Sequence, residues 1–298
     1  MKNHSAIWTI LIAVVIALGV QNLLLRPSPS TTAASKESTL DHVMRTKKMR
    51  CAYWIWPSLI ERNPNTGAMS GAFVDIINKV GEALGAEIVW QQEASFDDFG
   101  SLANSDKVDA VCGPLIPGPF LRPLAHFAAP VLYASFDIYV RPKDNRFNAS
   151  RDILNKPDTS ILSLDGSAAR YFATTLFPQA HHNSLPAILG AGQVLMDVKN
   201  GKDDATVSEQ LTATRFLDYN PNSLKKVSWD NKPLITLGLT LFGTKVDDIV
   251  WANTLDKIIS DLLDFGVVEQ ILTKNGLIAG KHYQAIARPY QDERKEIR

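Results

Sequence analysis

The stretch VDAVCGPLIPGPFLRPLAHFAAPVLY, residues 108–133, leads from one apolar segment into another through a proline-rich loop. Its first residues predict a buried strand, because short apolar runs of this kind are typical of strands covered on both faces. Four prolines follow between 114 and 123. Each lacks the backbone N–H that strand and helix interiors use, so we expect a loop of restricted shape. Arg122 is the only Lys, Arg, Asp or Glu between Asp109 and Asp137.

On either side of this stretch, strand-like and helix-like patterns alternate. Residues 47–55 and 86–91 predict strands, and the segment GAFVDIINKVGEALG between them predicts a helix that ends at Gly85. Further along, strands are expected at 159–164, 203–208 and 234–243, and helices at 166–177, 186–201 and 247–266. Strands that alternate with helices indicate an α/β protein with parallel-rich sheets flanked by helices.

The N-terminus carries a targeting signal. Lys2 precedes an apolar run from Ile7 to Val20, which a few more leucines extend to Leu25. The shorter run suits the core of a signal peptide with a weak cleavage site after Ala34, and the longer one suits an uncleaved membrane helix. Either alternative sends the rest of the chain across the membrane. We therefore expect a periplasmic protein that is soluble after cleavage or anchored by residues 7–25.

Composition excludes several classes of protein. Lys plus Arg and Asp plus Glu both number 31, so no net field favours nucleic acid or an anionic membrane. No Cys/His cluster has the spacing of a metal site, and we expect no metal and no cofactor. Cys51 and Cys112 lie in predicted neighbouring strands. Residues in register across a parallel pair seldom reach disulfide geometry, so two free, buried thiols are expected rather than a disulfide.

Several short motifs occur in a fixed order. YWIWPSL, NPNTG and GAFVDI are followed by LANSDKVDAV, FLRP and FAAPVLY, and then by GSA, GKDDATVSE, LGLTLFG and DFG. This order resembles the family 3 bacterial extracellular solute-binding proteins, the polar amino acid type of periplasmic binding protein. The resemblance covers about residues 45–275. It implies a two-lobed periplasmic-binding-protein-like fold of type II, in which a hinge connects two α/β lobes.

The resemblance also implies a division of the chain. The expected parts are a signal peptide or anchor over 1–25, a linker over 26–47, a first part of lobe one over 48–139, lobe two over 140–232, a return segment of lobe one over 233–277, and a polar C-terminal tail over 278–298. Connectors near 139–144 and 228–233 would form the hinge.

In lobe one, the resemblance assigns a ligand clamp to Arg122. A guanidinium offers a planar fork to a carboxylate, and an apolar loop excludes competing water; the alternative is a surface arginine. Trp54 and Trp56 match the aromatic region that covers the ligand, or else they are core residues. The family often has hydroxyl residues before the arginine, where this chain has apolar residues that include Leu115. This departure favours a larger or less polar carboxylate than a plain α-amino acid.

In lobe two, the resemblance assigns the ligand to two positions. Gly166, Ser167 and Ala168 open a helix, whose free N–H groups could hold an anion, although Ser167 could equally be an ordinary N-cap. Glu209 stands where the family keeps an aspartate for the ligand's amino group, or else it is a solvated acid at a helix start.

The implied function is binding rather than catalysis. The expected protein is a monomer that closes over a small carboxylate-bearing solute, amino-acid-like or an organic acid, and delivers it to an inner-membrane permease of the ABC type. It would bind no nucleic acid. One alternative is an anchored ligand sensor that acts through a partner. Another is an enzyme similar to cyclohexadienyl dehydratase with Glu209 as the acid, which is less favoured because no paired acid and base stand out.

Overall fold

The computed structural model of the protein describes residues 37–95, 98–119, 121–229 and 232–285. Residues 7–25, with the predicted signal or anchor, lie outside the described residues, as does the end of the predicted C-terminal tail. No helix within the described ranges is both long and apolar enough to span a bilayer. Everything below concerns the unit Ser38–Arg298.

Within the described residues, ten strands form one mixed sheet in the order β4-β1-β5-β12-β7-β10-β8-β9, with β6 beside β12 and β11 beside β7. We call the half of the sheet that contains β4, β1, β5 and β12 lobe one, and the half that contains β10, β8 and β9 lobe two. Lobe one contains α2 (Thr39–Thr46), β1 (Lys48–Tyr53), β2 (Glu61–Arg62), β3 (Met69–Ser70), α3 (Ala72–Leu84), β4 (Glu87–Glu93), α4 (Phe99–Ala103), β5 (Ala110–Leu115), β6 (His126–Phe127), β12 (Ile235–Thr244), α8 (Ile249–Asp264) and α9 (Val267–Lys274).

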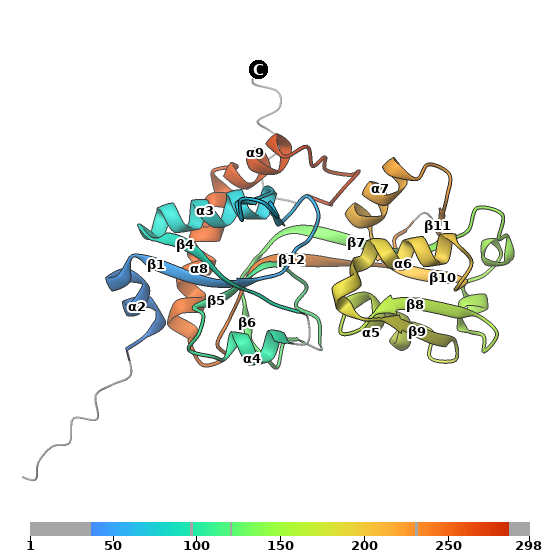
Figure 1. Ribbon diagram of the computed structural model, residues 1–298, viewed down its shortest axis with the longest axis horizontal. Helices are drawn as coiled ribbons and strands as arrows, with labels where there is room; N and C mark the ends of the chain where they lie inside the picture. Colours follow the sequence, from blue (N-terminus) through green and yellow to red (C-terminus); the bar gives the residue numbers. More distant parts are fainter. Residues whose placement is uncertain (1–36, 96–97, 120, 230–231, 286–298) are drawn as a thin grey trace, which may run out of the picture. The chain divides into compact units, whose positions relative to one another are not determined.

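Lobe two contains β8 (Ser160–Leu164), α5 (Ala168–Leu176), β9 (His181–Leu185), α6 (Gly190–Lys199), β10 (Ala205–Glu209), α7 (Gln210–Tyr219) and β11 (Lys225–Val227), with short 3-10 turns at Arg146–Asn148, Arg151–Asn155 and Ala187–Leu189. Helices α3 and α8 contact each other and the lobe-one strands, and α9 packs on α3 and α8. In lobe two, α5, α6 and α7 contact strands β8, β10 and β7 (Figure 1). β1 runs parallel to β4 and β5, and β8 runs parallel to β9 and β10. The α/β prediction is confirmed.

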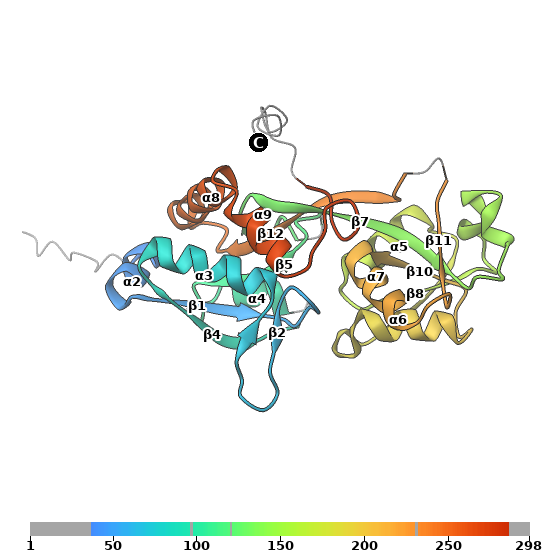
Figure 2. The ribbon, with the colours of Figure 1, turned by 90° about the horizontal axis from the view of Figure 1, so that it is seen from above.

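One long strand, β7 (Pro130–Val140), belongs to both halves of the sheet (Figure 2). It pairs with β12 from Pro130 to Phe136, and with β10 from Phe136 to Val140. Its side chains are buried from Ala134 to Val140. The sequence places a connector at 139–144, whereas the change of pairing partner occurs inside β7, because a continuous strand can pair with different neighbours along its length.

The glycine that precedes α3 is required by its surroundings. Gly71 has a φ of 116°, and a Cβ atom there would stand 2.5 Å from the carbonyl oxygen of Leu59. That carbonyl accepts a hydrogen bond from the N–H of Phe73 at 2.9 Å. The glycine of the GAFVDI motif therefore lets the chain after β1 pack directly on the start of α3.

The two ends of the described chain are more ordered than the sequence indicates. Helix α2 occupies Thr39–Thr46, inside the stretch expected to be a linker, and its Val43 is fully buried. At the other end, His282 and Tyr283 are buried within the segment expected to be a peripheral polar tail. Both segments gain their order from contacts with distant residues, which composition alone does not reveal.

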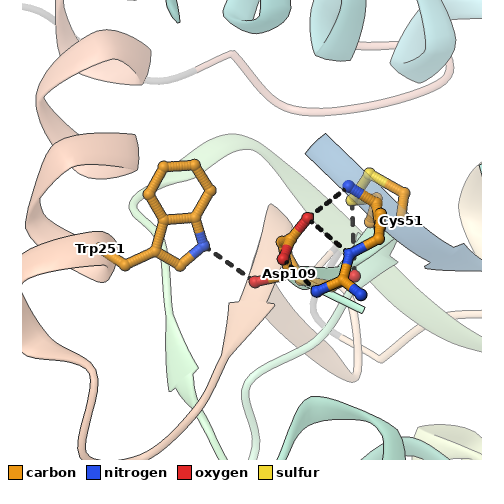
Figure 3. Close-up of a disulfide and its surroundings, with 6 residues drawn as sticks. Cys51, Asp109 and Trp251 are labelled. Atoms are coloured by element: carbon orange, nitrogen blue, oxygen red, sulfur yellow. Dashed lines mark hydrogen bonds and ion pairs between the residues drawn. A yellow bond between two sulfur atoms is a disulfide. The ribbon is translucent and has the colours of Figure 1, made fainter. Parts of the chain in front are cut away.

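The prediction of two free thiols is wrong, because Cys51 and Cys112 form a disulfide between β1 and β5 (Figure 3). The register pairs Cys51 with Ala110, so Cys112 lies two residues further along on the same face of the sheet. The two Cα atoms are 5.4 Å apart, within the usual range for a disulfide. The prediction assumed that the cysteines stand directly opposite each other, and this diagonal arrangement removes the objection.

Beside the disulfide, Asp109 joins three parts of lobe one (Figure 3). Its carboxylate accepts from the backbone N–H of Arg50 at 2.7 Å and pairs with the guanidinium of Arg50 at 2.8 Å. Its carbonyl oxygen accepts from the indole Nε1–H of Trp251 on α8 at 2.9 Å. The Asp109 carboxylate is nearly fully buried, and it is tolerated because it is paired and hydrogen-bonded.

We expect the disulfide to stabilise lobe one substantially. It closes a loop with a sequence separation of 61 residues, and replacing both cysteines with serine should lower the free energy of unfolding by about 2–4 kcal/mol. Denaturant unfolding of the parent and the double variant measures this difference. Alkylation of the denatured, non-reduced parent should add no mass in intact-mass analysis. Two added alkyl groups would show that the thiols are free.

Candidate functional site

The predicted site residues lie where four strands end. Trp54 and Trp56 follow β1, the proline loop with Arg122 follows β5, residues 166–168 follow β8, and Glu209 is the last residue of β10. In open α/β sheets, ligands bind outside the carboxyl ends of the strands. The predicted residues thus stand at or just after the carboxyl ends of four strands.

Glu209 is the best-defined residue of this group. It ends β10 and is the N-cap of α7, with 6% of its surface exposed. Its carboxylate accepts hydrogen bonds from the N–H of Leu211 at 2.7 Å and of Thr212 at 3.0 Å, and from the Thr212 hydroxyl at 3.2 Å. These bonds fix the carboxylate and satisfy amide groups that a helix start leaves unpaired.

Burial raises the pKa of Glu209 to about 7, and the hydrogen bonds from Leu211 and Thr212 oppose this rise only in part. The cause is the loss of water around the carboxylate, which disfavours its charged form. A carboxyl group with this pKa can change its protonation state near neutral pH. It can therefore pair with a cationic group when ionised, or donate a hydrogen bond when protonated.

A small cavity of about 10 Å³ lies beside Glu209. It is bounded by residues from both lobes and from the chain after α9, which are Leu59, Leu132, Glu209, Leu211, Leu239, Leu277, His282 and Tyr283. Because Leu59 belongs to the segment that follows Trp56, the structure brings Glu209 to the loop after β1. The lining is otherwise almost entirely apolar, which suits the raised pKa of the carboxyl group.

The start of α5 has the geometry predicted from the sequence. Gly166 has a φ of 68°, and Ser167 is the N-cap. The Ser167 hydroxyl donates to the carbonyl of Leu164 at 2.8 Å and accepts from the N–H of Arg170 at 3.2 Å. The structure therefore contains the ordinary N-cap, while the first-turn amides at and after Ala168 remain at positions without an intrahelical acceptor.

Trp54 and Leu115 lie in the core of lobe one. Leu115 is fully buried, and 7% of Trp54 is exposed. The Trp54 ring meets that of Phe99 edge to face at 6.5 Å, and all three residues belong to one hydrophobic cluster. Both side chains are therefore part of the core, and a ligand contact by either residue stays a prediction.

Trp56 and Arg122 lie in the loops themselves. Trp56 is half-buried, and its backbone pairs with that of Ile60, which folds the segment after β1 into a tight turn. Arg122 is exposed and lies in a turn, in which the Arg122 backbone N–H donates to the carbonyl of Gly118 at 3.0 Å. No hydrogen bond or ion pair of the Arg122 side chain occurs among the described residues. The role of Arg122 in binding the carboxylate of a ligand therefore stays a prediction.

Sequence reasoning missed the contribution of the chain after α9. His282 and Tyr283 line the cavity next to Glu209, although they lie more than seventy residues away from it in sequence. Residues 277–283 read LIAGKHY, which has neither a helical nor an alternating apolar pattern and so gives no local signal of this contribution. The described residues contain no cluster of His, Cys, Asp and Glu side chains that could hold a metal ion.

Comparisons with known proteins define the class of this fold. No protein-family model matches the chain. A curated protein of Haemophilus influenzae named "Probable amino-acid ABC transporter-binding protein" is 24% identical over 166 residues, which is 55% of this chain and 61% of that protein. A "Probable histidine-binding protein" of Campylobacter jejuni is 27% identical over 155 residues, which is 51% of this chain and 57% of that protein.

A solved structure gives the same result for the fold. An ancestral amino-acid-binding protein, described as a precursor of cyclohexadienyl dehydratase, superposes with a TM-score of 0.67 at 19% identity, over 80% of this chain and 98% of that one. The two-lobed fold of amino-acid-binding proteins is therefore confirmed, and so is the resemblance stated from the motifs. The matched region spans about three fifths of the length of the two curated relatives.

The raised pKa of Glu209 predicts how stability changes with pH. The folded-state pKa of about 7 lies above the ordinary value of 4.5, so the folded protein binds the extra proton between these values. Stability due to this group is complete below about pH 4.5 and is lost as the pH rises through 7. Glu209→Gln keeps the shape and removes the ionisation. Its free energy of unfolding should thus rise relative to the parent by ~1–3 kcal/mol between pH 5 and pH 8.

Urea unfolding of both proteins at several pH values measures this difference. Gln193→Ala on α6 serves as a control, since among the described residues the Gln193 side chain hydrogen-bonds only to the nearby Asp197. A difference between Glu209→Gln and the parent that stays constant from pH 5 to pH 8 would contradict the prediction.

Proposed function

We propose that the protein is an extracytoplasmic solute-binding protein of an ABC-type uptake system. It binds a small carboxylate-bearing solute, amino-acid-like or an organic acid, between its two lobes and delivers it as a monomer to an inner-membrane permease. The observation that carries the proposal is the buried Glu209, fixed at the end of β10 and adjacent in space to the segment after β1. The names of the two curated relatives support the same function.

Three parts of the chain would share the ligand. Arg122, exposed in its proline-stiffened loop, would take the carboxylate through two parallel N–H···O bonds. The start of α5 at Gly166–Ala168 would present its amides to the same group. Glu209 would accept from an amino or hydroxyl group. Little reorganisation is needed, because the prolines hold the loop and the cap at Ser167 holds the helix start.

The chemistry of the loops favours a ligand with apolar surface. Residues 114–117 read PLIP, so this stretch offers no side-chain hydroxyl to a carboxylate. Ala168 likewise offers only its backbone, and Trp56 has a half-buried aromatic ring in the segment after β1. A solute with one carboxylate and a substantial apolar part matches this set of groups better than a small polar amino acid.

The location follows from the same proposal. A solute-binding protein delivers its ligand outside the inner membrane, so we place the folded part in the periplasm. Residues 7–25 would act either as the core of a cleaved signal peptide or as an anchor. Determining the N-terminal residue of the mature protein separates these alternatives, because cleavage after Ala34 would release the folded part.

The ligand can be identified directly. Native mass spectrometry of the freshly purified protein should show a small bound mass, and a thermal-shift panel of proteinogenic amino acids and aromatic or aliphatic carboxylic acids should contain compounds that raise the melting temperature. The proposal fails if no carboxylate in the panel stabilises the protein and no small molecule copurifies with it.

Arg122→Ala should weaken binding of the strongest panel compound by about 2–5 kcal/mol, because it leaves a desolvated carboxylate unpaired. Arg122→Lys should also bind more weakly, since one ammonium cannot reproduce the fork of a guanidinium. Isothermal titration calorimetry measures both effects. Arg151→Ala, an exposed arginine of lobe two away from the strand ends, is the matched control. Unchanged affinity in a folded Arg122→Ala protein would show that this arginine merely faces solvent.

A further inference from the structure

The chain after α9 forms a compact segment, residues 277–284, which we call the C-terminal strap. Two hydrogen bonds link Ile278 and His282, from the His282 N–H to the Ile278 carbonyl at 2.8 Å and from the Ile278 N–H to His282 Nδ1 at 3.0 Å. The N–H of Gly280 donates to the carbonyl of Tyr283 at 2.7 Å. The strap therefore has a defined shape of its own, maintained by internal bonds.

The strap is attached to the lobe-one side at both of its ends. At its start, the N–H of Leu277 donates to the carbonyl of Leu272 on α9 at 2.9 Å. At its end, Gln284 and Tyr133 exchange two backbone hydrogen bonds of 2.8 and 2.9 Å. Tyr133 lies in the part of β7 that pairs with β12, where it stands opposite Gly238.

The middle of the strap contacts lobe two. The side-chain amide of Gln210 donates to the carbonyl of Lys281 at 2.7 Å and makes a longer contact of 3.4 Å with the carbonyl of Gly280. Gln210 is the first residue of α7 and directly follows Glu209. The strap is therefore a further link between the lobes, in addition to the strand β7.

Apolar packing reinforces this link. Leu277, His282 and Tyr283 of the strap are each at most 5% exposed. They line the small cavity together with residues of lobe one and with Glu209 and Leu211 of lobe two. Its volume of about 10 Å³ is close to the least that can hold one water molecule, so the three parts are tightly packed.

The same packing leaves one polar group unpaired. Because His282 Nδ1 accepts from the Ile278 N–H, a neutral imidazole carries its proton on Nε2. His282 Nε2 is buried and has no hydrogen-bond partner within the described residues. A buried donor without an acceptor opposes the packed state. The strap thus packs tightly on both lobes, while the unpaired Nε2–H of His282 lowers the stability of this packing. This combination suits a contact that opens when the lobes separate.

We propose that the C-terminal strap is a latch between the two lobes. It remains fixed to α9 and β7, and it holds lobe two through the side chain of Gln210. Separation of the lobes then requires that the Gln210 bonds break, while the bonds between Tyr133 and Gln284 persist. In the ligand-free protein, the latch determines which fraction of molecules has separated lobes and which fraction has joined lobes.

The test measures the distance between the lobes in the ligand-free, full-length protein. Nitroxide labels at Lys257→Cys on α8 and Tyr219→Cys on α7 report this distance by electron–electron double resonance. Both sites are exposed, and the native cysteines do not react because they form a disulfide. Gln210→Ala removes the donor, and Gln210→Glu keeps the size of the side chain but can no longer donate to the two carbonyls.

We expect both Gln210 variants to increase the population of long distances by about threefold or more, as the loss of one hydrogen bond implies. Gln193→Ala, which removes a glutamine donor within α6, should match the parent. Hydrogen exchange at the Tyr133 and Gln284 amides should remain slow in all variants. Unchanged distances in both Gln210 variants, or loss of protection at those two amides, would overturn the proposal. The experiment contains no ligand, so its outcome does not bear on the proposed solute-binding function, which is tested separately by the ligand panel and calorimetry.

Discussion

The pairing of β7 with strands of both lobes is the constraint on which the rest of the molecule depends. From Pro130 to Phe136 the strand pairs with β12, and from Phe136 to Val140 it pairs with β10. Any change in the register of β7 would shift both halves of the sheet together, because side chains alternate between faces with each residue. The positions of the strand ends that carry the proposed site thus depend on this one strand.

Glu209 shows how that constraint reaches the site. It stands opposite Phe136, the residue of β7 that pairs with both β10 and β12, and it is also the N-cap of α7. A carboxylate at this position is held by the helix start on one side and by apolar packing on the other. The same arrangement buries it and raises its pKa. Glu209 therefore has a structural and a proposed functional role, since the hydrogen bonds that cap α7 also fix the carboxylate that we propose binds the ligand.

Much of the architecture could be predicted from short-range signals. The helix at 71–85, the strands near 48, 110, 160, 205 and 235 and the cap at Ser167 all follow from apolar periodicity and helix-start chemistry. The disulfide could not, because it depends on a register in which Cys51 pairs with Ala110 rather than with Cys112. The core positions of Trp54 and Leu115 also depend on packing between segments that are distant in the chain.

The sequence by itself determined many of the strands and helices, although not β9, α7 or β11, and it also indicated the proline-stiffened loop around Arg122, because propensity and periodicity act over a few residues. Only the tertiary structure decided which of these residues meet. It placed His282 and Tyr283 beside Glu209 and joined Gln210 to Lys281, across about seventy residues of chain. Such contacts result from the simultaneous packing of many side chains into one core, which no local pattern encodes.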